Sequence, residues 1–182
     1  MGKGRNPAMP TEVALEEAAL RYLERYASSA AGVRRVLMRR LRRAGRDEVE
    51  DGQAQDAAIE AVIAKLTRLG LLDDRRYAEA RASGLARRGA SLFVIRRDLR
   101  SRGVARTQIE AAVSQLKDEA GGNSDAVDRV AALALARRRR LGPFREPQVR
   151  AHYRDRDLAA LGRAGFALEV ARSVIDGDSE DG

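Results

Sequence analysis

The 182-residue chain contains no cysteine and no tryptophan, and it has few aromatic residues and only four prolines. The absence of cysteine excludes disulfides, thiolate metal sites and a cysteine nucleophile. No apolar run approaches the roughly 20 residues that cross a bilayer, and no apolar stretch follows the basic N-terminus. We therefore expect neither a membrane span nor a secretion signal, and we place the protein in the cytoplasm.

Patterns typical of catalysis are also missing. His152 is the only histidine, lies in an arginine-rich stretch and has no obvious nucleophile beside it. Neither a phosphate-binding nor a dinucleotide-binding glycine pattern occurs. Glu48, Glu50 and Asp51 are acidic but lack the spacing of a calcium loop. We expect a binding protein that needs no catalytic residue, metal, cofactor or small-molecule substrate.

Good helix formers dominate the residues that are present, and glycines separate the segments they form. Apolar residues recur at three- and four-residue steps, as in Leu15, Ala18, Ala19, Tyr22 and Tyr26. This pattern predicts an all-α fold with a polar loop at 46–56. The predicted helices cover about residues 11–26, 32–44, 57–69, 75–87, 92–102, 106–117, 125–139, a segment ending near 165, and 168–175.

A repeated pattern groups these helices in threes. Leu-x-x-x-Gly recurs at the ends of three predicted helices, where its glycines are expected to be left-handed C-caps: Gly45, Gly103 and Gly165. A second pattern follows each copy, beginning at Ile59, Ile109 and Leu168. We predict three tandem three-helix repeats that stack into an elongated, curved molecule. The predicted division is 1–10 disordered tail, 11–70 repeat 1, 71–117 repeat 2, 118–124 linker, 125–175 repeat 3 and 176–182 acidic disordered tail.

The turn before the fourth predicted helix carries signals of its own. Either Asp73 or Asp74 is predicted to be the N-cap of that helix. If the cap is Asp73, Leu72 and Tyr77 occupy the two positions of a hydrophobic staple. Such a staple fixes the direction in which the chain enters the helix.

Basic residues outnumber acidic ones by 35 to 27, which gives a formal net charge of +8. This excess predicts an acidic partner, such as nucleic acid or a nucleoprotein. At 100° per residue, the arginines of the second and fifth predicted helices lie opposite or beside the apolar faces. The predicted partner-binding residues are Arg35, Arg39, Arg42, Arg96, Arg97, Arg100, Arg137 and Arg138. A solvated helix face, and the attraction of cations to a helix C-terminus, are the structural alternatives.

These motifs resemble the RecX family, bacterial regulators of the recombinase RecA. Residues 70–78 (GLLDDRRYA) are similar to the central signature of the family, and residues 89–104 (GASLFVIRRDLRSRGV) to the pattern that follows it. Residues 161–166 (LGRAGF, ending at Phe166), with Val170 and Val174 after them, resemble the last repeat. The first repeat departs from the pattern, because Val33 takes the place of Ser91 and the 46–56 loop is long.

The resemblance implies tandem three-helix repeats and a negative regulator of RecA. RecX-like proteins bind the groove of the RecA filament on single-stranded DNA and lower its ATPase, strand-exchange and co-protease activities. This implies a part in DNA repair, DNA recombination and the SOS response, with no catalytic residue. We also expect a monomer with weak direct DNA binding. Two alternatives stay open, namely a basic helical DNA-binding protein and a helical-repeat scaffold for another protein.

Overall fold

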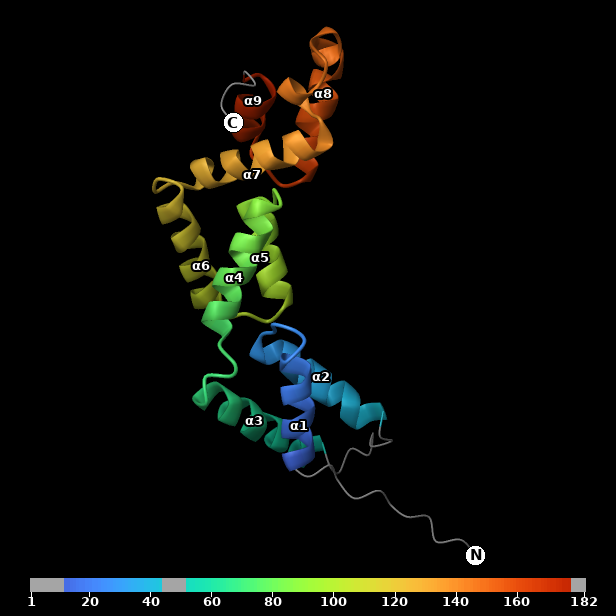
Figure 1. The fold of residues 1–182 in the computed structure, drawn as a ribbon, viewed down its shortest axis with the longest axis vertical. Helices are drawn as coiled ribbons and strands as arrows, with labels where there is room; N and C mark the ends of the chain where they lie inside the picture. The colour runs from blue at the N-terminus through green and yellow to red at the C-terminus, as the bar shows by residue number, and fades with distance from the viewer. Residues whose placement is uncertain (1–11, 44–51, 178–182) are drawn as a thin grey trace, which may run out of the picture. The chain divides into compact units, whose positions relative to one another are not determined.

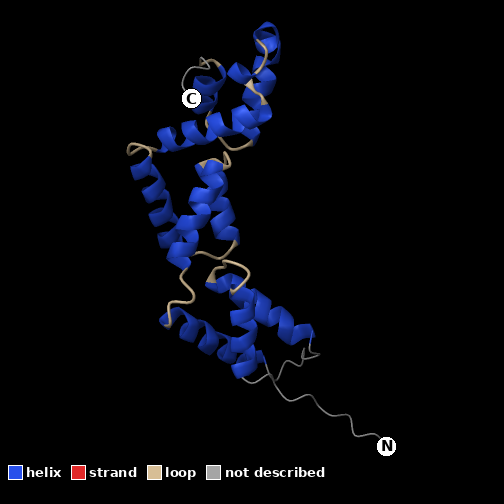
Figure 2. Ribbon diagram, viewed as in Figure 1, coloured by secondary structure: helices blue, strands red, loops and turns tan. Residues whose placement is uncertain are grey.

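The described part of the chain is helical throughout. A computed structural model describes residues 12–43 and 52–177, which form nine α-helices and one short 3-10 helix (Figure 1, Figure 2). This confirms the predicted all-α class. The helices are α1 (Glu12–Leu23), α2 (Ala30–Arg43), α3 (Gly52–Arg68), α4 (Asp74–Arg87), α5 (Leu92–Ser101), α6 (Arg106–Glu119), α7 (Ser124–Arg139), η2 (Gly142–Phe144), α8 (Pro147–Arg163) and α9 (Leu168–Ile175).

The helices form two compact units that divide between Tyr77 and Ala78. Unit 1 contains α1, α2, α3 and the first turn of α4, whereas unit 2 contains the rest of α4 and the helices α5 to α9. The division into three repeats at the predicted boundaries stays a prediction, as does the shape inferred from it.

Unit 1 is a three-helix packing in which every helix contacts the other two. On α2, Val33, Leu37 and Leu41 follow one another at four-residue steps and are all buried. Leu72, just beyond α3, is also buried in this core. The other core residues are Leu15, Ala18, Ala19, Ile59, Val62, Ile63 and Leu66.

Two predictions in unit 1 are wrong. Helix α1 ends at Leu23, so Tyr26 leaves the buried face on which it was predicted and is 58% exposed. Residues 52–56, predicted as part of a loop, form the first turn of α3, because their glutamine and alanine residues favour a helix. The predictions made for residues 1–11 and 44–51, including the C-cap at Gly45, lie outside the described residues.

Unit 2 is organised around α7, which packs against α5, α6 and α9 (Figure 1). Helices α8 and α9 pack on each other, and the 3-10 helix lies against both. Val170, Ala171, Val174 and Ile175 bury one face of α9.

Two predicted boundaries within unit 2 need correction. The linker predicted at 118–124 is shorter, because α6 continues to Glu119 and α7 begins at Ser124. Asp176, predicted to begin a disordered tail, accepts hydrogen bonds from Arg154 at 2.7 and 2.6 Å and belongs to the fold. Residues 178–182 lie outside the described residues.

Candidate partner-binding surface

The predicted basic face of unit 1 lies on α2. Arg35, Arg39 and Arg42 are all exposed and project opposite the buried Val33 and Leu37. Helix α2 contains no acidic residue, so nothing on the helix itself neutralises this face. Its neighbour Arg34 forms an ion pair with Glu60 of α3. The outer face of α2 is therefore strongly cationic.

The hydrogen bonds at the N-termini of α2 and α5 show which residues of the two helices are equivalent. The Ser29 hydroxyl oxygen accepts a hydrogen bond from the Gly32 amide at 3.1 Å, and Ser91 accepts one from Val94 at the start of α5 at 3.4 Å. The counterpart of Ser91 is thus Ser29, and the predicted equivalence with Val33 is wrong by one helical turn.

A carboxylate from a helix later in the chain, α4 for the first cap and α7 for the second, completes each of these caps. Asp74 Oδ1 accepts from the Ala30 amide at 2.7 Å, and Asp128 Oδ1 of α7 accepts from the Leu92 amide at 2.8 Å. Each carboxylate satisfies an orphan N–H at a helix start. Burial raises the pKa of Asp128 by more than the Leu92 hydrogen bond lowers it.

The predicted basic face of unit 2 lies on α5, and its three arginines differ in their surroundings. Arg96 forms two hydrogen bonds with Glu110 of α6 at 3.1 and 3.2 Å, and these lower the pKa of Glu110. Arg97 lies over the ring of Phe93, 5.9 Å from its centroid, and is exposed. Arg100 is also exposed.

The corrected register shows which arginines are equivalent in the two units. Because Ser29 matches Ser91, Arg34 matches Arg96 and Arg35 matches Arg97. Arg34 and Arg96 both pair with a glutamate of the following helix. The repeat therefore uses the first arginine to join two helices and turns the second outward.

The arginines at the end of α7 have contacts within unit 2. Arg138 donates to the backbone carbonyl of Arg88 at 2.8 Å and so satisfies a group at the C-terminus of α4. Arg137 lies over the ring of Phe144, 5.5 Å from its centroid. Both side chains also help to join α7 to its neighbours.

The motif residues of the turn before α4 take separate roles. Asp73 is the cap of α4, since its carboxylate accepts from the Arg76 amide at 3.0 Å. Asp74 instead reaches the start of α2. Leu72 is buried and Tyr77 is half-buried, as a staple requires.

Gly103 and Gly165 end α5 and α8 in the same way. Both have positive φ, +76° and +86°. The residues that follow them, Val104 and Phe166, are buried and donate backbone hydrogen bonds to Leu99 and Leu161 at 3.2 Å. This is a Schellman C-cap, which favours glycine at the left-handed position.

The N-termini of α6 and α9 show that the predicted equivalence of Leu168 and Ile109 is wrong. Leu168 is exposed, whereas Ile109 is buried. The N-cap of α6 is Ala105, whose carbonyl accepts a hydrogen bond from the Ile109 amide. The N-cap of α9 is Ala167, whose carbonyl accepts one from the Ala171 amide, so the residue equivalent to Ile109 is Ala171.

A buried ion pair in unit 2 was missed by the sequence analysis. Asp157 is 1% exposed and accepts hydrogen bonds from Arg145 at 2.6 and 2.8 Å and from the Gly142 amide at 2.8 Å. Burial raises the pKa of Asp157, but these hydrogen bonds outweigh it and leave the pKa below its ordinary value. In the corrected register, Asp157 occupies the position equivalent to the buried Ile95 of α5. This equivalence is the sequence signal that could have identified Asp157 as buried.

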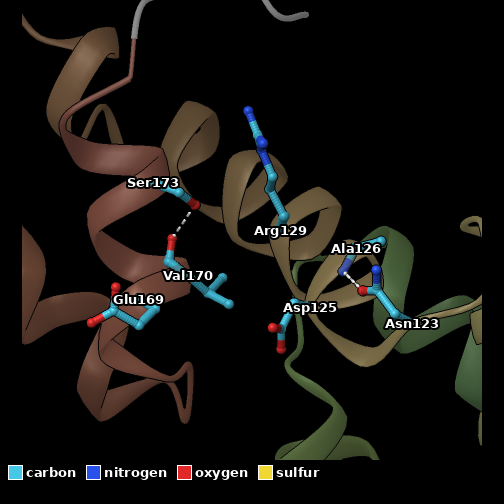
Figure 3. A pocket seen from close by; sticks show the side chains of 7 residues that line it. All are labelled: Asn123, Asp125, Ala126, Arg129, Glu169, Val170 and Ser173. Atoms are coloured by element: carbon cyan, nitrogen blue, oxygen red, sulfur yellow. Dashed lines mark hydrogen bonds between the residues drawn. The ribbon is translucent and has the colours of Figure 1, made fainter.

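A polar depression lies between α7 and α9 (Figure 3). In this view Arg129 points away from Asp125 and Glu169, while Ser173 donates to the Val170 carbonyl at 2.9 Å. The polar side chains that line the depression therefore do not converge on one point. Within residues 12–43 and 52–177, no group of histidine and acidic side chains could hold a metal ion. No helix in that same part of the chain is long and apolar enough to cross a membrane.

Known proteins with similar sequences and structures share one description. Residues 73–113 match the model of the second three-helix domain of RecX. Regulatory protein RecX of Myxococcus xanthus is 41% identical over 178 residues, covering 96% of this chain and 92% of that protein. The Agrobacterium fabrum protein of the same name is 30% identical over 141 residues, covering 76% and 71%. A crystal structure of regulatory protein RecX is similar in fold, with a TM-score of 0.62 at 20% identity, covering 92% of this chain and 72% of that chain.

Proposed function

The chain belongs to the RecX family, and we propose that it is a negative regulator of RecA that binds the groove of the RecA–DNA filament. In this proposal it inhibits the ATPase, strand-exchange and co-protease activities of RecA. The observation that carries the proposal is the 41% identity to a regulatory protein RecX over 96% of this chain. The protein acts by binding and performs no chemistry itself.

The exposed arginines support the choice of partner. Arg35, Arg39 and Arg42 on α2, with Arg97 and Arg100 on α5, are the residues we propose to face the filament. Such a filament presents DNA phosphates and protein carboxylates, and the planar guanidinium binds both through paired hydrogen bonds. The remaining predicted residues are Arg96, which pairs with Glu110, Arg137, which lies over Phe144, and Arg138, which donates to the Arg88 carbonyl.

Electrostatic attraction gives this binding a defined salt dependence. A cationic surface speeds the encounter with an anionic filament, and added salt screens the attraction over a distance of about 10 Å at 0.1 M ionic strength. We therefore expect the inhibition to weaken as the salt concentration rises.

The decisive experiment measures DNA-dependent ATP hydrolysis by the cognate RecA at saturating single-stranded DNA, titrated with this protein. We expect strong inhibition well below one molecule per RecA, unrelieved by additional DNA. Absence of inhibition, or its relief by excess DNA, would contradict action on the filament. The second result would favour direct binding to nucleic acid, for which the cationic outer face of α2 is the supporting observation.

Charge reversal tests the proposed surface. The double variant Arg39→Glu/Arg42→Glu should raise the concentration needed for half-inhibition, because it replaces two outward cations with anions. Arg25→Glu/Arg68→Glu is the matched control, since both arginines are exposed in unit 1 and lie outside α2. Equal inhibition by the two double variants would remove α2 from the proposed surface.

A further inference from the structure

Phe93 stands out on the outer face of α5. Its side chain is 60% exposed, although large apolar residues usually lie inside a fold. Helix α5 fills the core of unit 2 with Leu92, Ile95 and Leu99, which are all buried. Phe93 therefore does not serve the hydrophobic core.

The repeat itself does not require an aromatic residue at this position. In the corrected register, the counterpart of Phe93 on α2 is Ala31, which is small and half-buried. The 62-residue spacing from Gly103 to Gly165 places Asp155 at the same position of α8, where its side chain is 98% exposed. Three different side chains thus occupy one structural position, and only one of them is aromatic.

The fold holds Phe93 in a defined place. The Arg97 guanidinium lies 5.9 Å from the centroid of its ring, within the range of a cation–π contact. Just beyond α8, a Cβ atom added to Gly165 would lie 3.0 Å from Cδ1 of Phe93, so the ring packs closely against this glycine. A side chain fixed before binding loses less conformational entropy when a partner covers it.

The charges around the ring indicate the chemistry of its partner. Arg97 and Arg100 lie on the same side of α5 as Phe93. The only acidic residue of the helix, Asp98, is turned away and accepts hydrogen bonds from Arg81 and Arg102 at 2.9 Å. The complementary surface is an apolar pocket with a carboxylate at its rim.

From this geometry we propose that Phe93 and Arg97 form the anchor by which unit 2 docks into such a pocket on a protein. The pocket belongs to a RecA subunit of the filament, an assignment that rests on the function proposed above. A protein pocket is favoured over a nucleobase because Arg97 already lies over the ring that a base would have to stack upon. Buried aromatic and arginine side chains are the usual centres of binding energy in protein interfaces.

The test compares Phe93→Ala and Phe93→Leu with wild type in the RecA ATPase assay at constant salt. Truncation of a central aromatic residue at an interface costs about 2 kcal/mol or more, so Phe93→Ala should raise the half-inhibitory concentration roughly 30-fold. Phe93→Leu keeps an apolar side chain and should lose much less inhibition than Phe93→Ala. Leu168→Ala is the control, because Leu168 is a 54% exposed apolar residue of unit 2 and should behave as wild type.

Three results would overturn the inference. Inhibition by a folded Phe93→Ala protein equal to that of wild type would show that the ring is not an anchor, while leaving the proposed function intact. Equal losses for Phe93→Ala and Phe93→Leu, with parallel loss of single-stranded DNA binding in the absence of RecA, would assign the ring to base stacking. A wild-type protein that does not inhibit RecA would remove the proposed function and this inference with it. Thermal denaturation monitored by circular dichroism establishes that each variant is folded.

Discussion

Helices α2 and α5 begin with the same kind of cap, yet the units that contain them differ in size. Unit 1 contains three helices and the first turn of α4, whereas unit 2 contains the rest of α4 and five further α-helices. In unit 1 the carboxylate that completes the cap comes from Asp74, the first residue of α4. In unit 2 it comes from Asp128, which lies beyond the first turn of α7. The Ser91 hydroxyl also donates to the Ala164 carbonyl at 2.9 Å and so joins this cap to the end of α8.

Glycines let the elements of unit 2 approach more closely than side chains would permit. A Cβ atom on Gly89 would lie 2.8 Å from the Leu135 amide nitrogen of α7, and one on Gly165 would lie 2.8 Å from Ser91 Oγ. By contrast, Gly70 at the end of α3 has open space around it. The comparison teaches that a shared helix cap does not determine the size of a unit, whereas close backbone contacts join helices α4 to α9 into one.

The largest loss of stability confined to unit 2 is expected when its buried ion pair is broken. Asp157→Ala leaves the Arg145 guanidinium without its carboxylate, and breaking a buried pair costs about 3–5 kcal/mol. Hydrogen exchange should show lost amide protection in α7 to α9 and unchanged protection in α1 to α3. The control Asp155→Ala, at an exposed position of α8, should leave both units as they are.

The same pair gives unit 2 a dependence on pH. The pKa of folded Asp157 lies below its ordinary value of 3.8, so its stabilising contribution is complete above that pH and is lost as the pH falls through the folded pKa. The difference in melting temperature between wild type and Asp157→Asn should therefore be large at pH 6 and shrink as the pH falls below about 4. A difference that stays constant between pH 6 and pH 2 would contradict this account.

A methyl group at Gly89 should weaken unit 2 by a smaller amount. Gly89→Ala combines backbone strain at φ +80° with a clash against α7, and together these cost about 3 kcal/mol. Gly70→Ala, at φ +69° with nothing nearby, carries only the backbone strain of about 1 kcal/mol. Urea denaturation of both variants measures the difference, and equal costs would show that the contact of Gly89 with α7 is loose.

The smallest effects should come from the two equivalent caps. Asp74→Ala and Asp128→Ala each remove one acceptor from a helix start, at a cost of about 1 kcal/mol. Asp128→Asn keeps an acceptor oxygen without a buried charge, so it should be less destabilising than Asp128→Ala. Denaturation followed separately in α2 and α5 by hydrogen exchange would reveal whether each loss stays within its own unit.

The helices could be predicted from the sequence because local signals mark their ends. Gly103 and Gly165 have the left-handed conformation that their pattern predicted, and Asp73 is one of the two caps that the sequence offered for α4. The repeat register was misjudged because apolar residues on α2 recur every four residues. A shift of one turn therefore moves Leu41 onto Leu37 and preserves the buried face.

The candidate surface could be predicted only in part. Helical periodicity correctly placed Arg35 and Arg97 on exposed faces, because that property is local. It could not reveal that Arg96 reaches Glu110 or that Arg138 reaches the Arg88 carbonyl, since those contacts depend on how helices pack. The same periodicity sets Phe93 away from the buried face of α5, but its close approach to Gly165 depends on packing.

Asp157 also bears on how a chain of similar helical groups avoids assembling incorrectly. Tandem copies with interchangeable apolar faces are prone to domain swapping and to pairing with the wrong neighbour. In the last group, a carboxylate replaces the isoleucine found at the matching position of α5, and its partner Arg145 lies in the same group. If α5, which has an isoleucine at this position, took the place of α8, the Gly142 amide and the Arg145 guanidinium would lose their acceptor, which is unfavourable. The ion pair therefore favours α8 over α5 at this position, and it helps the last three helices to pack with one another.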